Sequence, residues 1–141
     1  MISLLRSEIA VVGGGPAGLS AALAAAKQGA SVALIDSGER LGGQLIKQTH
    51  RFFGSQKEHA GTRGIEIARM LTDEVSQDPR IGVLLDANVL GYYRDKVLTI
   101  EKDDRILKLQ AERTIIATGA SERMLPFPGN DLPGVYGAGA V

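Results

Sequence analysis

Residues 9–18, IAVVGGGPAG, decide the fold of this 141-residue chain. An apolar run typical of a buried strand leads directly into spaced glycines, and an alanine-rich segment with helical spacing follows. Gly13 lets the chain turn sharply out of the strand, Gly15 lets the backbone approach a pyrophosphate, and Gly18 lets the helix lie close to the sheet. Pro16 suits the first helical turn, where an N–H has no partner in the helix. The stretch therefore predicts a turn that binds the phosphates of a dinucleotide at a helix N-terminus.

An acidic residue follows at the spacing that such a fold requires. Residues 31–35 form a second apolar run, and Asp36 ends it about 20 residues after the glycines, where an acid that binds ribose hydroxyls is expected. Gly29 stands where a left-handed helix cap belongs. We therefore predict a strand, a helix and a strand over residues 8–12, 16–28 and 31–35. Asp36 suits the adenosine ribose of FAD and of NAD equally.

The remaining sequence predicts further elements of an α/β domain. Residues 37–61 are polar and rich in glycine, and long irregular segments of this kind tend to be functional. A helix is expected over residues 62–77, which Asp78 and Pro79 end. Strands are expected over the following segments: 81–85, 89–93, 97–100, 106–109 and 114–117. The apolar, β-branched segment 114–117 is typical of a strand buried in a parallel sheet. The fold class is Rossmann-like: one domain over residues 1–141, with a central parallel sheet, helices and a small antiparallel β-meander.

Composition excludes several function classes. Sixteen Lys and Arg balance sixteen Asp and Glu, so there is no basic field for nucleic acid, and no nucleic-acid partner is expected. The chain has no cysteine and only two histidines without nearby acidic clusters, which excludes thiol chemistry and makes us expect no metal site. No apolar stretch approaches the ~20 residues that cross a bilayer, so we expect no membrane contact and a cytoplasmic location. Redox chemistry would have to come from a bound cofactor.

Two further glycine motifs extend the predicted site. Gly42 and Gly43 follow Asp36 closely, and their backbone N–H groups could meet a diphosphate while Arg40 adds a charge-assisted bond and Gln44 reaches the phosphates or a flavin. Residues 117–119 (ATG) close the last predicted strand. They would lie at the same sheet edge as Gly13, where ligands of open α/β sheets bind.

We expect structural roles for the histidines and the paired aromatic residues. His50 and His59 stand in the polar segment, where a histidine is more often solvated than catalytic, so no catalytic residue is identified. Two aromatic pairs, 52–53 and 92–93, could stack on a ring system, but packing in the core is the expected role.

Taken together, these motifs resemble the N-terminal FAD segment of the two-dinucleotide-binding-domain flavoproteins, a superfamily of FAD-dependent pyridine nucleotide oxidoreductases that includes thioredoxin reductase. Within this superfamily, residues 121–135 (SERMLPFPGNDLPGV) are most similar to the branch that oxidises amines and amino acids. That branch contains sarcosine oxidase alpha subunits, opine oxidases and hydrogen cyanide synthase subunits.

The resemblance implies roles for individual residues. The glycine turn would hold the FAD pyrophosphate, Asp36 and Ser37 the adenosine ribose, and the backbone of Val89 the adenine. Arg40, Gly43 and Gln44 would contact the phosphates and the ribityl chain, and residues 117–119 would line the inner side of the cofactor. The full set of expected cofactor contacts is Gly13, Gly14, Gly15, Pro16, Ala17, Gly18, Asp36, Ser37, Arg40, Gly42, Gly43, Gln44, Val89, Ala117, Thr118 and Gly119.

The resemblance also implies a function. The chain would be the FAD-binding part of a flavin-dependent oxidoreductase that transfers hydride to or from flavin, acting on a small-molecule amine or amino acid, or using NAD(P)H. The NAD(P) domain and the C-terminal segment that completes the FAD site in such proteins are absent from this sequence, so we expect an N-terminal fragment. A partner subunit or a homo-oligomer is compatible with the apolar run 134–141. Two alternatives stay open: a non-catalytic nucleotide-binding or assembly module that needs a partner chain, and an NAD-linked dehydrogenase domain.

Overall fold

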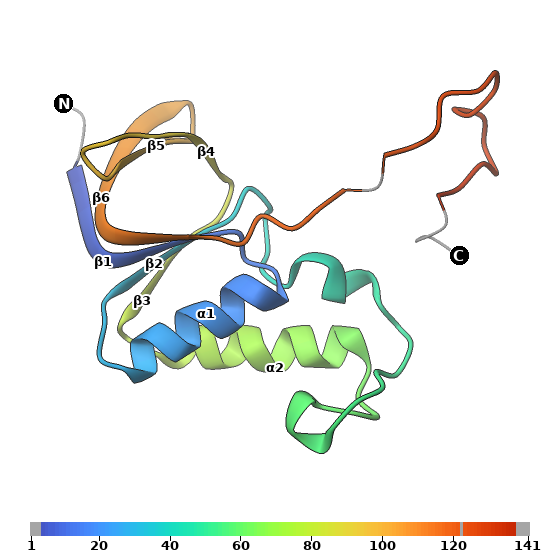
Figure 1. Ribbon diagram of the computed structural model, residues 1–141, viewed down its shortest axis with the longest axis horizontal. Coiled ribbons are helices and arrows are strands. Elements are labelled where there is room, and N and C mark those ends of the chain that lie inside the picture. The colour runs from blue at the N-terminus through green and yellow to red at the C-terminus, as the bar shows by residue number, and fades with distance from the viewer. Residues whose placement is uncertain (1–3, 122, 138–141) are drawn as a thin grey trace.

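The computed structural model describes residues 4–121 and 123–137, so residues 138–141 of the apolar run and Glu122 lie outside the described part. The described residues form one six-stranded sheet with the order β3-β2-β1-β6-β5-β4 (Figure 1). The strands are β1 (Leu4–Val12), β2 (Val32–Ile35), β3 (Ile81–Leu84), β4 (Ala87–Tyr92), β5 (Val97–Lys102) and β6 (Arg105–Ile116). The helices are α1 (Pro16–Lys27) and α2 (Gly64–Gln77), and two 3-10 turns are η1 (Gly43–Lys47) and η2 (Gln56–Glu58). The α/β, Rossmann-like prediction is confirmed.

The parallel part of the sheet places three chain segments at one edge. β1 pairs in parallel with both β2 and β6, and Val12 lies opposite Ile35 on one side and Ile116 on the other. The three strands therefore end level. The N–H of Gly13 donates to the carbonyl of Ile35 at 2.8 Å. The N–H of Ala117 donates to the carbonyl of Val12 at 2.7 Å. The predicted motifs after β1, β2 and β6 thus meet at the carboxyl edge.

Each face of the parallel strands is covered by a different layer. α1 and α2 pack on one face, where Leu19, Ala22 and Val75 meet Val11 and Leu34 of the strands. Small alanines let α1 lie close to the sheet, which agrees with their predicted spacing.

The opposite face is covered by the antiparallel meander of β4, β5 and β6, which curls over the parallel strands in Figure 1. Val12 and Ile35 pack there against a cluster that includes Ala87, Leu98 and Ile100. The N–H of Ala87 donates to the carbonyl of Asp36 at 3.0 Å, so the start of β4 is joined to the end of β2.

The prediction of two separate strands over 106–109 and 114–117 is wrong, because β6 is one continuous strand. Its first half pairs with β5, and β1 pairs with it from Lys108 to Ile116. The polar residues between the predicted segments therefore remain hydrogen-bonded as strand. The expectation that 114–117 is buried is also wrong, because Ile115 is 36% and Ile116 is 64% exposed.

Core packing was the wrong role for three of the four paired aromatic residues. Phe53 is 95% exposed on an irregular segment. Tyr92 and Tyr93 are 53% and 55% exposed at the end of β4, after a β-bulge that interrupts this strand between Val89 and Gly91. Only Phe52 is half-buried. β4 also begins at Ala87 rather than at Val89, so Val89 lies inside the strand.

In residues 4–121 and 123–137, neither helix has the length and apolar character needed to cross a bilayer. The same residues bring together no cluster of three His, Cys, Asp or Glu side chains that could hold a metal ion.

Candidate functional site

The glycines of the first turn differ in what surrounds them. Gly13 has a φ of 108°, and a Cβ there would collide with the carbonyl of Ala117. A Cβ on Gly18 would collide with the carbonyl oxygen of Gly13. These two glycines are required by the packing of the chain itself. By contrast, a Cβ on Gly15 would meet only the Cα of Gly43, at 3.8 Å, so this glycine leaves open space in front of the turn.

The N-terminus of α1 faces that open space with no acidic residue in its own first turn. Gly15 caps the helix with no side-chain hydrogen bond. The free N–H groups and the positive end of the helix dipole therefore remain available to a phosphate.

Asp36 joins the two loops at the edge of the sheet. Its Oδ2 accepts a hydrogen bond from the N–H of Gly14 at 2.5 Å, and its Oδ1 accepts one from the N–H of Gly38 at 2.7 Å. Sequence reasoning predicted a ribose-binding role and missed this structural one. Because a carboxylate has about four acceptor positions, two bonds to the backbone leave capacity for ribose hydroxyls.

The second glycine motif packs directly against the first. The N–H of Gly42 donates to the carbonyl of Gly14 at 2.8 Å. A Cβ on Gly43 would lie 2.7 Å from the Cα of Gly15, and both Gly42 and Gly43 have positive φ. Leu41, a residue that the prediction missed, is 7% exposed beneath Gly14. The motif predicted to meet a diphosphate is thus held beside the turn predicted to do the same.

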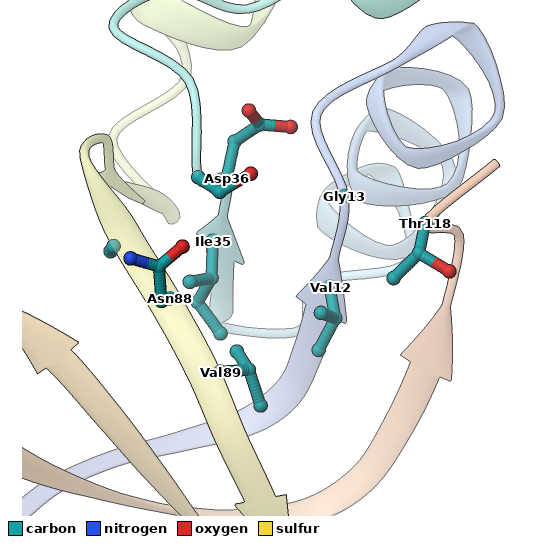
Figure 2. A pocket seen from close by; sticks show the side chains of 9 residues that line it. Val12, Gly13, Ile35, Asp36, Asn88, Val89 and Thr118 are labelled. Atoms are coloured by element: carbon teal, nitrogen blue, oxygen red, sulfur yellow. The ribbon is translucent and has the colours of Figure 1, made fainter. Parts of the chain in front are cut away.

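Two pockets open at this edge. The first, of about 230 Å³, is shown in Figure 2 and is lined by Val12, Gly13, Ile35, Asp36, Ser37, Ala87, Asn88, Val89 and Thr118. The second, of about 310 Å³, is lined by Gly13, Gly15, Pro16, Ala17, Asp36, Gly43, Gln44, Ala117, Thr118, Gly119, Ala120 and Ser121. Gly13, Asp36 and Thr118 line both pockets. The two pockets therefore adjoin as one trough, which we call the edge trough, running from β4 past the N-terminus of α1.

The structure brings most of the predicted site residues to this trough. Twelve of the sixteen line it, and the four that do not are Gly14, Gly18, Arg40 and Gly42. Gly14 and Gly42 are buried within the loops and Gly18 is buried within α1, whereas Arg40 is exposed outside both pockets. The lining residues that the prediction missed are Val12, Ile35, Ala87, Asn88, Ala120 and Ser121. Asn88 and Ala87 precede the predicted Val89 directly, so a strand beginning two residues earlier would have included them.

Neither histidine lines the trough. The ring of His50 stacks on that of Phe52 with centroids 5.2 Å apart, and both belong to a separate open hollow around residues 50–54.

The fold and the trough define a Rossmann-like nucleotide-binding protein. Residues 7–139 match the family described as pyridine nucleotide-disulphide oxidoreductase, and the chain belongs to that family. It is 34% identical to sarcosine oxidase subunit alpha of Rhizobium meliloti (strain 1021), over 99% of this chain and 15% of the relative. It is 35% identical to hydrogen cyanide synthase subunit HcnB of Pseudomonas protegens, over 89% of this chain and 27% of the relative. The crystal structure of L-proline dehydrogenase from P. horikoshii matches with a TM-score of 0.82 and 26% identity, over 95% of this chain and 27% of that one.

These matches confirm the predicted superfamily and its amine-oxidising branch. The family consists of oxidoreductases and implies FAD as the cofactor, with NAD(P) used by related enzymes. The chain spans between 15% and 27% of the length of the two curated relatives.

Proposed function

We propose that the edge trough is the FAD site of this chain. The adenosine would occupy the first pocket, at the ends of β1 and β2 and beside the backbone of Val89. The pyrophosphate would lie in the second pocket, over the open space at Gly15 and against the N-terminus of α1. The continuity of the two pockets through Gly13, Asp36 and Thr118 is the observation that carries this proposal.

The predicted contacts would bind different parts of FAD along the edge trough. Asp36 and Ser37 would bind the ribose hydroxyls, and Gly13, Gly15 and Ala17 would present backbone to the phosphates. Gly43, Gln44 and residues 117–119 would line the path toward the ribityl chain. Gly14 and Gly42 would act by shaping the loops, and Gly18 by letting α1 lie close to the turn. Arg40, outside the trough in this structure, would reach the phosphates only through its long side chain.

When bound, FAD would supply hydride transfer at its isoalloxazine ring, and the chain's residues would bind and orient it. As substrate class we propose a small amine or amino acid, since two similar proteins are named as sarcosine oxidase and L-proline dehydrogenase. Transfer from NAD(P)H is the second possibility for this branch. The small share of each relative that the chain spans supports placing the NAD(P)-type domain and the segment completing the FAD site outside these 141 residues. The relatives' names also describe subunits, which supports a partner subunit.

The binding proposal is tested by titrating the flavin-free protein with FAD, ADP and NAD in a calorimeter and recording the flavin absorbance bands. We expect one FAD per chain, competition by ADP and weaker binding of NAD. NAD binding more tightly than FAD would instead favour the NAD-linked dehydrogenase alternative. If none of the three binds, the proposal is wrong.

A second candidate function is a nucleotide-binding assembly module that a partner chain completes. Exposed apolar side chains favour it, because Ile116, Leu125 and Tyr136 are 64%, 77% and 71% exposed. Size-exclusion chromatography distinguishes the two functions, since a monomer that binds FAD stoichiometrically argues against a module that needs a partner.

A further inference from the structure

We infer that Asn88, oriented by a hydrogen bond to Glu101, accepts a hydrogen bond from the exocyclic amino group of adenine in the first pocket. The pocket would therefore bind adenine nucleotides more tightly than hypoxanthine nucleotides. This inference rests on the proposed function, because it assumes that the first pocket receives the adenosine of the cofactor. It adds two side chains, neither of which the motifs or the resemblance indicated.

The pocket offers few polar side chains, and they differ in what they can do. Asp36 already accepts hydrogen bonds from two backbone N–H groups. Ser37 and Thr118 carry hydroxyls, which both donate and accept and therefore discriminate poorly between bases. Asn88 is the one side-chain amide among the lining residues.

A neighbouring strand fixes the orientation of that amide. Asn88 on β4 lies opposite Glu101 on β5, and its Nδ2 donates to Oε2 of Glu101 at 2.9 Å. A carboxylate only accepts hydrogen bonds, so the amide must turn its nitrogen toward Glu101. Its Oδ1 is then left as an acceptor. Figure 2 shows this oxygen on the side of Asp36 and the nitrogen pointing away.

The chemistry of the base follows from that orientation. Adenine carries an amino group, a donor, where hypoxanthine carries a carbonyl oxygen, an acceptor. An acceptor held in place accepts a hydrogen bond from the amino group of adenine. With hypoxanthine, two acceptors would face each other, which is unfavourable. The half-buried Val89 supplies an apolar side chain beside a planar ring, so the amide oxygen of Asn88 is the side-chain group that would add to the backbone of Val89 in distinguishing bases of equal size.

The test compares ADP with IDP, its hypoxanthine analogue, by calorimetry on the flavin-free full chain. For the wild type we expect ADP to bind about tenfold more tightly than IDP or better. Asn88→Ala, at an exposed position, should bring the two dissociation constants within about twofold of each other. Glu101→Gln should lower the preference as well, because a glutamine amide can accept from Asn88 or donate to it and no longer fixes its orientation. Thr99→Ala, on β5 outside the pocket, is the matched control and should keep the wild-type ratio.

The outcomes separate this inference from the function on which it rests. Equal binding of ADP and IDP by the wild type overturns the inference alone. An Asn88→Ala variant that weakens both nucleotides equally also overturns it, because the amide would then contact the ribose. A wild type that binds neither nucleotide nor FAD overturns the proposed function and the inference together.

Discussion

At the scale of single residues, the glycines of the first turn serve two different purposes. Gly13 and Gly18 are required because a side chain would collide with backbone, whereas Gly15 has open space before it. The sequence predicts that Gly13 allows a sharp turn, that Gly18 lets the helix lie close to the sheet and that Gly15 lets the backbone approach a phosphate. The structure supports that division and refines one part of it, because the backbone that Gly18 approaches is the carbonyl of Gly13, at the end of the strand.

Gly18→Ala should destabilise the fold by about 2 kcal/mol or more, because the backbone of Gly13 cannot move aside as a flexible side chain could. Urea unfolding without nucleotide measures this effect. Gly82→Ala on β3 is the matched control, since a Cβ there lies 3.8 Å from the carbonyl oxygen of Val32, and it should change stability by less than about 0.5 kcal/mol. Equal stability of the two variants would contradict the assignment.

Gly15→Ala should show the opposite behaviour. The new methyl group meets only the Cα of Gly43, so the free energy of unfolding without nucleotide should stay within about 0.5 kcal/mol of the wild type. The methyl group nevertheless enters the second pocket, and FAD affinity should fall about tenfold or more, which is about 1.4 kcal/mol. Calorimetry checks the affinity. Unchanged FAD binding would remove Gly15 from the site.

At the scale of elements, strand pairing extended further than local patterns indicated. β1 begins at Leu4, although Arg6, Ser7 and Glu8 interrupt its apolar run. Its polar start is held by hydrogen bonds across the sheet: the carboxylate of Glu8 accepts from the N–H of Ser31 at 2.7 Å and from its hydroxyl at 2.9 Å. Pairing of this kind joins residues distant in sequence, so alternation of apolar residues could not predict it.

The Glu8 carboxylate gives this region a pH dependence. The hydrogen bond from the Ser31 backbone, followed by that from its hydroxyl, lowers the pKa of Glu8 below its usual 4.5. A lowered folded-state pKa means that the stabilisation is complete above the unfolded pKa and is lost as the pH falls through the folded one. Glu8→Gln should therefore be less stable than the wild type at pH 7, and the difference should disappear in acid. Urea unfolding between pH 7 and 3 tests this, and a difference independent of pH would contradict it.

At the scale of the whole molecule, the edge trough exists because four strands end or begin beside one another. The ends of β1, β2 and β6 contribute the glycine turn, Asp36 and residues 117–119, and the curled meander brings in β4. A ligand in the trough would therefore contact segments from residue 12 to residue 121 and stabilise the fold as a unit.

Saturating FAD should consequently raise the stability of the entire chain. With free FAD at 100 times its dissociation constant, linkage predicts a gain of about 2.7 kcal/mol, or a rise in melting temperature of roughly 10 °C. Thermal unfolding followed by circular dichroism measures it. The Gly15→Ala variant should gain less at the same FAD concentration. An identical gain in both proteins would place FAD outside the trough.

The sequence by itself determined the strand–helix–strand unit, the glycine turn and the acid at Asp36, because these depend on short-range spacing and backbone conformation. Only the tertiary structure decided that β6 is continuous, that the meander covers one face of the sheet, and that Asp36 joins two loops by backbone hydrogen bonds. Only the tertiary structure placed Asn88 in the site, too. Its position beside Asp36 depends on the curvature of the sheet and on the pairing with Glu101, and no local sequence pattern encodes such long-range contacts.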